Sequence, residues 1–236
     1  MDEASGARED SFGNLDLTNF TGIGSVTGQR NQAANCMLIN SGLYVNGNSS
    51  LSFNNQNFSI SCYVYFENTS QWATADQFLC VRQNSNNGTE LFQLKKTVDG
   101  STPKIQFLIT SSSGTSVGVL ADSFGALNTG SWYNVVAWHS NLTHIGISVN
   151  LSVNTTNTLT GVLGNSAGQF IAGVHDTSSA ATSVLYGRLD ELGIWNRVLT
   201  SAERSDLYGG GSGNTYTPGV GTISWACFDF GATNIR

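Results

Sequence analysis

The stretch Phe58-Ser59-Ile60-Ser61-Cys62-Tyr63-Val64-Tyr65-Phe66 decides the fold class. Its apolar side chains occupy every second position, namely Phe58, Ile60, Cys62, Val64 and Phe66. Because successive side chains of a β-strand point to opposite faces, this spacing predicts a strand with one buried face. Cys62 is accordingly expected in the core as a small apolar residue.

Comparable short runs recur along the chain, separated by clusters of Gly, Asn and Ser. This pattern is typical of an all-β fold in which two antiparallel sheets form a sandwich. Strands are expected near residues 33–39, 43–46, 57–66, 77–83, 89–95, 104–110, 115–121, 131–139, 143–149, 168–174, 184–196 and 221–230.

One short helix is expected near residues 201–208. The stretch Thr200-Ser201-Ala202-Glu203 has the spacing of a capping box, in which the side chains of Thr200 and Glu203 each accept a hydrogen bond from the other residue's amide. The glycine-rich residues 209–213 end this helix.

The composition limits the classes of partner. Only 11% of the 236 residues are charged, with 10 Lys and Arg against 16 Asp and Glu, which gives a net charge of −6. Phosphate binding needs clustered cations, so we expect no nucleic-acid partner. We also expect neither membrane insertion nor a secretory signal, since apolar runs stay well below ~18 residues and the sequence starts with the polar, acidic residues 1–6.

Two further segments predict strands buried on both faces. Alternation in residues 132–138 places Trp132, Asn134, Val136 and Trp138 on one face and Tyr133, Val135 and Ala137 on the other. Alternation in residues 189–195 places Leu189, Glu191, Gly193 and Trp195 on one face and Asp190, Leu192 and Ile194 on the other. We therefore expect Trp132, Trp138 and Trp195 to lie in the core.

Four segments resemble the laminin-G-like, concanavalin-A-like jelly roll, in the bacterial and phage branch used in surface and virion proteins. Residues 2–11 resemble its opening turn, residues 58–65 its first long core strand, residues 130–139 its central Gly-x-Trp strand, and residues 189–200 the closing strand that leads into a short helix. The resemblance implies a jelly-roll sandwich over residues 1–213. It implies much less about function, because this fold carries lectins, glycosidases and structural domains.

Residues 214–236 lie beyond the part that resembles the family and form a C-terminal extension. They include an apolar, β-prone segment, whose assembly residues are Ile223, Trp225, Cys227, Phe228 and Phe230. The resemblance also implies a strand before the opening turn, whereas Met1 directly precedes Asp2 here. We expect the C-terminal segment to extend a sheet of its own subunit, with donation to another subunit as the alternative.

The sequence favours a protein without catalytic activity. Glycosidases on this jelly roll carry two carboxylates on one strand face, whereas Asp190 and Glu191 are adjacent and project to opposite sides of an extended strand. The three histidines, His139, His144 and His175, lack the spacing of a metal site. The four cysteines, Cys36, Cys62, Cys80 and Cys227, contain no Cys-x-x-Cys pair, and disulfide bonds among them stay open.

Calcium is the one cofactor that the resemblance suggests, although none is required. Asp190 matches the acidic position of the family, and Asp176 is a loop carboxylate that offers a further oxygen ligand. We expect instead that Asp190 accepts hydrogen bonds from loop amides, with calcium binding as the alternative.

Glycan binding needs exposed aromatic side chains beside polar groups. Trp72 is the best candidate, because it lies in a polar loop with no obvious core partner, and Asp76 follows in the same loop. Tyr44 and Tyr186 are further candidates beside polar loops.

Together these observations favour a non-catalytic structural and adhesive subunit, extracellular or on a virion. It would be a phage fibre, tail or capsid decoration, or a unit of an extracellular filament, with copies of itself or other surface proteins as partners. The alternative is a lectin-like, carbohydrate-binding module, assisted by calcium in one version.

Overall fold

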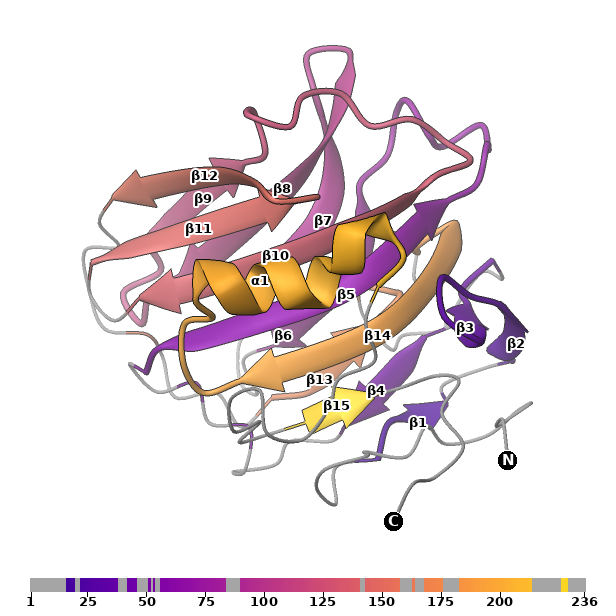
Figure 1. Cartoon of the computed structure of the whole chain (residues 1–236). Coiled ribbons are helices and arrows are strands. Elements are labelled where there is room, and N and C mark those ends of the chain that lie inside the picture. Colours follow the sequence, from indigo (N-terminus) through magenta and orange to yellow (C-terminus); the bar gives the residue numbers. More distant parts are fainter. Residues whose placement is uncertain are drawn as a thin grey trace.

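Two antiparallel β-sheets pack face to face in the computed structural model, and a short helix lies outside them (Figure 1). The structure describes residues 16–19, 22–37, 42–45, 51, 53, 56–83, 90–140, 143–157, 163, 168–175, 183–213 and 226–228, with only the backbone for residues 157 and 226–228. The predicted all-β jelly-roll sandwich is confirmed.

Within the described residues, one sheet has seven strands and the other has eight. In spatial order, the seven-stranded sheet contains β1 (Thr18–Asn19), β4 (Leu43–Val45), β13 (Phe170–Ala172), β6 (Gln77–Gln83), β7 (Glu90–Asp99), β8 (Thr102–Thr110) and β9 (Ser116–Leu120). The eight-stranded sheet contains β12 (Ser152–Asn157), β11 (His144–Val149), β10 (Trp132–Ser140), β5 (Phe58–Phe66), β14 (Gly187–Trp195), β3 (Gln32–Asn35) and β2 (Gly24–Thr27), and β15 (Ala226–Phe228) also pairs with β14.

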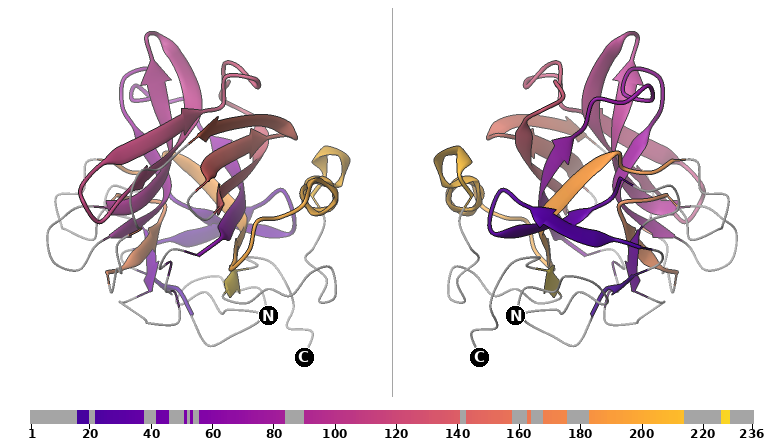
Figure 2. Two further views of the ribbon diagram at one scale, coloured as in Figure 1. Left: turned by 90° about the vertical axis from the view of Figure 1, so that its left-hand side faces the viewer. Right: turned by 90° about the vertical axis from the view of Figure 1, so that its right-hand side faces the viewer.

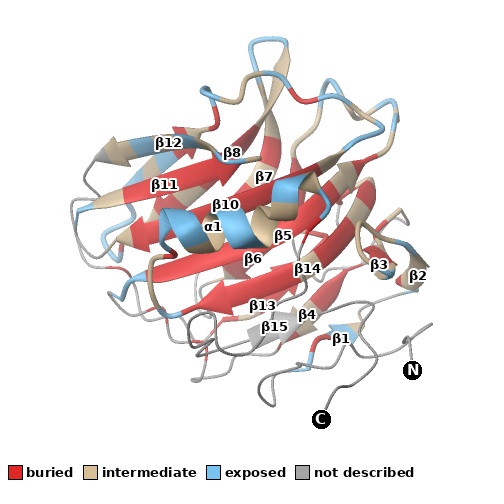
Figure 3. Cartoon of the chain, viewed as in Figure 1, coloured by how far each residue is buried: buried red, intermediate tan, exposed pale blue. Residues whose placement is uncertain are grey.

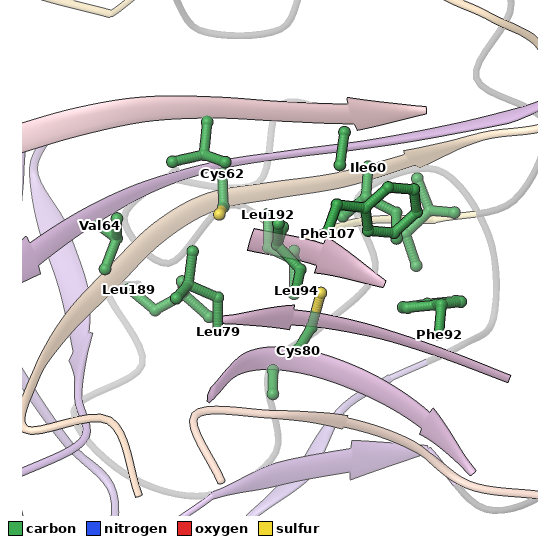
Figure 4. Packing of buried hydrophobic residues seen from close by; sticks show 14 of the residues in the cluster. Ile60, Cys62, Val64, Leu79, Cys80, Phe92, Leu94, Phe107, Leu189 and Leu192 are labelled. Atoms are coloured by element: carbon green, nitrogen blue, oxygen red, sulfur yellow. The ribbon is translucent and has the colours of Figure 1, made fainter. Parts of the chain in front are cut away.

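The core lies between the sheets, where the alternating residues of the long strands meet. In Figure 4, side chains of β5 and β14 meet side chains of β6, β7 and β8. The five alternating residues of β5 are all fully buried, which confirms the prediction from residues 58–66. On β10, Tyr133, Val135 and Ala137 join this core as well, whereas Trp138, which was expected in the core, lies on the opposite face under the helix.

Cys62 and Cys80 belong to this core, and Cys36 is buried there too. No disulfide bond joins any two of these three residues. Burial raises the pKa of the Cys62 and Cys80 thiols well above the ordinary value of a cysteine.

The helix α1 (Ser201–Tyr208) lies against the outer face of the eight-stranded sheet, as the side views show (Figure 2). It begins with the predicted capping box, because the side chains of Thr200 and Glu203 each accept a hydrogen bond from the other residue's backbone amide. It ends at Gly209, whose φ of 52° is the left-handed conformation, and a short 3-10 turn, η2 (Gly209–Gly211), follows. The apolar cluster at this face contains Val136, Trp138, Trp195 and Leu199, with Val198 and Leu207 packed against it.

A tyrosine of the sheet fixes the carboxyl end of α1. The Tyr63 hydroxyl donates to the carbonyls of Leu207 at 3.1 Å and Tyr208 at 2.8 Å. These carbonyls lie in the last turn, where a helix leaves carbonyl groups without an intrahelical donor. The helix therefore has a defined position on the sheet.

The predicted alternation in residues 189–195 is wrong, because β14 contains a bulge. The pairing of β14 with β5 shifts between Asp190 and Gly193, and Glu191 has a φ of 48°. The bulge turns Leu189 to the same core as Leu192 and Ile194, whereas Trp195 joins the cluster under α1. The extra residue of a bulge moves the residues after it to the opposite face of the sheet, and the residue types in the strand do not reveal this.

Several other predicted boundaries also need correction. The strands β1, β2 and β12 were not predicted, because their polar residues alternate too weakly to indicate a buried face. The strands expected at 33–39, 168–174 and 184–196 are shorter, at Gln32–Asn35, Phe170–Ala172 and Gly187–Trp195. The burial pattern follows the long strands, which are buried in their middle and more exposed at their ends (Figure 3).

The C-terminal segment adds a strand to its own subunit. β15 pairs antiparallel with β14, and residues 226–228 lie opposite residues 194–192. The pairing covers three residues, and the choice between extension of the chain's own sheet and donation to another subunit stays a prediction. Of the assembly residues, Ile223, Trp225 and Phe230 lie outside the described residues, and the division at residue 213 stays a prediction.

Candidate functional site

A single row of residues crosses the outer face of the seven-stranded sheet. Residues directly opposite each other on paired strands point to the same face of a sheet. Tyr44 lies between Leu43 and Val45, which face the core, so Tyr44 and its partners face outward. Across the sheet, the pairs are Tyr44 with Ile171, Ile171 with Val81, Val81 with Gln93, Gln93 with Leu108, and Leu108 with Gly118.

An apolar cluster with two tyrosines occupies one half of this face, and we call it the tyrosine patch. Tyr44 on β4 and Tyr186, just before β14, are half-buried and pack against it. Phe78 is 5% exposed, and the aliphatic members are buried. The tyrosine patch consists of Tyr44, Phe78, Val81, Ile171, Val174, Val184 and Tyr186.

Backbone pairing places Tyr186 over this face. Val174 and Val184 form an isolated bridge, and the amide of His175 donates to the carbonyl of Ser183 at 3.0 Å. The amide of Tyr186 then donates to Oε1 of Gln77 at 3.2 Å. The segment before β14 therefore folds back onto β6 and brings Tyr186 to the tyrosine patch.

Charged and polar side chains border the tyrosine patch. The His175 ring lies 4.5 Å from the Phe78 ring between centroids, and its Nε2 is 2.7 Å from Oε1 of Glu90. On the other side, the Lys95 ammonium lies 5.4 Å from the Phe78 centroid and donates to Asp76 at 2.7 Å. The hydrogen bond from His175 is the main reason that the pKa of Glu90 lies below its ordinary value, so this carboxylate is charged at neutral pH.

This arrangement combines the two properties that sugar recognition requires. Tyrosine rings offer apolar surface for the C–H groups of a sugar, and their hydroxyl groups take part in hydrogen bonds. The carboxylates of Asp76 and Glu90 are acceptors for sugar hydroxyl groups, and Lys95 is a donor. Three of the four predicted glycan residues, Tyr44, Tyr186 and Asp76, therefore come together on this face.

Trp72 lies apart from the tyrosine patch, and the expectation that it has no core partner is wrong. Its ring is 5.3 Å from the Phe66 ring between centroids, and it packs against the main core. The buried Lys96 donates to the Trp72 carbonyl at 2.7 Å. Nothing in the sequence indicated that Lys96, at a core-facing position of β7, binds this loop.

Asp190 accepts hydrogen bonds from backbone amides, as expected. It is fully buried, and its two oxygens accept from the amides of Arg30 and Glu191, each at 2.9 Å. Gly28 lies close by, since a Cβ there would be 2.5 Å from Oδ2 of Asp190. Asp190 thereby stabilises both the bulge of β14 and the turn between β2 and β3.

Calcium binding stays a prediction. Asp176 lies outside the described residues. Within the described part of the chain, no three His, Cys, Asp or Glu residues gather in a way that could hold a metal ion. No helix there is long and apolar enough to cross a membrane.

The sequence missed several members of the site and misplaced Trp132 as well as Trp72. The sequence analysis did not predict four residues of the site, namely Phe78, Glu90, Lys95 and His175. β6 is apolar on both faces, and its pairing with β7 shifts between Phe78 and Cys80, so the pattern did not indicate which residues face outward. Trp138 and Trp195 are buried as expected, whereas Trp132 is only half-buried.

The structure resembles several solved structures at low sequence identity. Domain 4 of the extracellular arabinanase AbnA from Geobacillus stearothermophilus, solved with arabinotriose, is 19% identical, with a TM-score of 0.56 over 79% of this chain and 81% of that domain. A heptameric pentraxin from Limulus polyphemus is 13% identical, with a TM-score of 0.51 over 69% and 78% of the two chains. The binding domain of botulinum neurotoxin serotype D is 13% identical, with a TM-score of 0.62 over 84% of this chain but only 47% of the toxin chain.

These likenesses concern the fold, and the sequence itself identifies the family. No curated protein matches the chain. The family model of the concanavalin A-like lectin/glucanases superfamily, of the laminin G type, matches residues 40–203, which is well over half of the sequence. The chain therefore belongs to the concanavalin A-like lectin/glucanases superfamily.

Proposed function

We propose that this protein is a non-catalytic carbohydrate-binding domain that acts outside the cytoplasm. The observation that carries the proposal is the tyrosine patch, where Tyr44 and Tyr186 border Phe78 beside charged side chains. A half-exposed aromatic surface with a few polar groups at its edge is the usual composition of a small-molecule site.

The position of the tyrosine patch supports the proposal. The helix α1 covers the outer face of the eight-stranded sheet, whereas the tyrosine patch lies on the outer face of the seven-stranded sheet. The environment of Asp190 also supports the non-catalytic part of the proposal. Asp190 is buried and accepts two amides, so it is not available to a substrate.

The known relatives of the fold agree with this class of function. The arabinanase domain was solved with arabinotriose, and the neurotoxin domains are binding domains. A surface glycan is accordingly the proposed partner, and adhesion to it is the proposed role.

A binding assay with matched variants tests the proposal. The full chain is applied to an array of neutral and acidic glycans that includes arabinotriose, and affinities for bound glycans are measured by calorimetry. We expect Tyr44→Ala and Tyr186→Ala to weaken binding about tenfold each, because each removes an aromatic contact surface. Val153→Ala is the control, since Val153 is 42% exposed on β12 of the other sheet.

Two results would overturn the proposal. One is the absence of binding to every glycan on the array. The other is binding that the double variant Tyr44→Ala/Tyr186→Ala leaves unchanged although it folds like the wild type. Turnover of a glycan would contradict the non-catalytic assignment.

A second candidate function is assembly, as a virion or filament subunit. The observation in its favour is the pairing of β15 with β14 over three residues, because so short a terminal strand is suited to exchange between copies. Light scattering of the full chain and of a chain without residues 219–236 tests it. Oligomers that become monomers on truncation support assembly, and a monomer in both cases contradicts it.

A further inference from the structure

A second aromatic surface lies on the opposite sheet, and we call it the Trp132 platform. It consists of Trp132 on β10, Tyr65 on β5, Arg188 on β14 and Glu67 just after β5. Trp132 lies directly opposite Tyr65, and Tyr65 lies directly opposite Arg188. The three side chains therefore form one row on the outer face of the eight-stranded sheet.

The members of the row are in contact with one another. The Trp132 and Tyr65 rings are 5.5 Å apart between centroids. The Arg188 guanidinium lies over the Tyr65 ring, 4.6 Å from its centroid. All four residues of the platform are half-buried, so each also offers surface to solvent.

Arg188 is held flat against the row by two further contacts. Its Nη2 donates to Oε1 of Glu67 at 2.9 Å, and its Nη1 donates to the Thr27 carbonyl at 3.2 Å. Glu67 cancels the charge of Arg188, so the platform as a whole is neutral. A guanidinium fixed at both ends loses little further entropy when a ligand binds, which favours recognition.

The helix α1 protects only the neighbouring part of this face. Along β10, Val136 and Trp138 point the same way as Trp132, and both are buried in the cluster under α1. Trp132 lies at the start of β10 and is not a member of that cluster. A half-exposed tryptophan at the edge of a covered face is a typical contact residue of binding sites.

We infer that the Trp132 platform is a second carbohydrate site, which binds a neutral oligosaccharide. The inference rests on the proposed function for the class of ligand, but it concerns different residues on the opposite sheet. The aromatic rings contact the C–H face of a sugar ring, and the Glu67 carboxylate accepts from its hydroxyl groups. With the tyrosine patch on the other sheet, the domain holds two sugar chains at once and gains avidity for a multivalent surface.

Fluorine NMR tests the platform directly in the full chain. The protein is labelled with 5-fluorotryptophan, and the Trp132 resonance is identified by its absence from Trp132→Phe. The probes are arabinotriose, xylotriose, cellotetraose, mannotriose and N-acetylchitotriose. We expect at least one of them to shift the Trp132 resonance in a saturable way, while the resonance of the buried Trp195 stays in place.

Variants separate the two sites. Trp132→Ala is expected to weaken binding at the platform at least tenfold and to reduce the calorimetric stoichiometry from two sugars to one. Tyr44→Ala/Tyr186→Ala is expected to leave the Trp132 shift intact and to remove the other site. If the Trp132 variant does not fold, Tyr65→Leu serves the same purpose, because it removes the ring between Trp132 and Arg188.

The outcomes distinguish the two proposals. A Trp132 resonance that none of the five probes shifts overturns the second site, whatever the tyrosine patch binds. In another outcome, a probe shifts the Trp132 resonance, and Tyr44→Ala/Tyr186→Ala binds as many sugars per chain as the wild type. That outcome supports the platform and overturns the tyrosine patch. The second site is also overturned if the wild type binds one sugar per chain and Trp132→Ala still binds one.

Discussion

The ammonium of Lys96 lies 5.2 Å from the centroid of the Trp72 ring and donates a hydrogen bond to the carbonyl of the same residue at 2.7 Å. Lys96 is fully buried on β7, and it also donates to the Ala75 carbonyl at 2.5 Å. One side chain thus binds two carbonyls in the loop between β5 and β6. A buried charge of this kind is retained only where its hydrogen bonds compensate for the loss of water.

Replacing this lysine is expected to destabilise the protein. Lys96→Met keeps the apolar part of the side chain but removes the donors to two carbonyls, at a cost of about 1–3 kcal/mol in the free energy of unfolding. Urea unfolding at pH 7 measures this cost. The control is Lys104→Met, because Lys104 forms only exposed ion pairs with Asp99 and Asp122.

The pH dependence of the same variant gives a second test. Burial lowers the pKa of Lys96 to about 8, against 10.5 in the unfolded chain. Between these values the unfolded chain binds more protons, so the wild type gains stability as the pH rises, by at most ~1.4 kcal/mol per pH unit. The difference between the wild type and Lys96→Met is expected to grow from pH 8 to pH 10, and a constant difference would contradict the low pKa.

The capping box of α1 is expected to lose its effect in acid. Arg197 donates two hydrogen bonds of 2.7 Å to the Glu203 carboxylate, and these are the main reason that the pKa of Glu203 lies at about 2. Because the folded pKa is depressed, the stabilisation is complete above pH 4.5 and is lost as the pH falls toward 2. Glu203→Gln is expected to cost about 1 kcal/mol at pH 7 and almost nothing at pH 2. Thermal unfolding at both pH values measures the two differences, and an equal cost at both would rule out a role for the charge.

Asp190→Asn is expected to destabilise the sandwich by about 2 kcal/mol. An asparagine offers one acceptor where the carboxylate offers two, so the amide of Arg30 or Glu191 loses its partner. Urea unfolding is compared with that of Asp122→Asn, in which the affected side chain is exposed. A rise in the melting temperature of the wild type with calcium, absent from Asp190→Asn, would instead support the calcium ligand role.

The core thiols are expected to resist alkylation in the folded protein. Cys62 and Cys80 are fully buried, and burial raises the pKa of both thiols, so neither forms the reactive thiolate near neutral pH. Iodoacetamide treatment followed by peptide mass mapping is expected to leave both unmodified, and labelling in denaturant shows that both are then accessible. Rapid labelling of either residue in the native protein would mean that the sandwich opens locally.

The features that the sequence by itself determined are those that depend on neighbours along the chain. The period of two defined the inner face of residues 58–66 and the two faces of residues 132–138, because backbone geometry fixes the side of each successive residue. The capping box at Thr200 and Glu203 is equally local, since both partners lie within one turn of helix. The prediction that Asp190 accepts hydrogen bonds from amides succeeded for a different reason, because a buried carboxylate needs hydrogen-bond donors wherever they lie in the chain.

Only the tertiary structure decided which residues from distant strands meet. Tyr44 and Tyr186 share one patch because β4, β13 and β6 pair in a particular register, and Trp132 meets Tyr65 and Arg188 through the pairing of β10, β5 and β14. The bulge at Glu191 reverses the faces that alternation predicts, and the contact with Phe66 makes Trp72 a packing residue. Register and bulges follow from the packing of the whole sandwich, so no local pattern in the chain contains them.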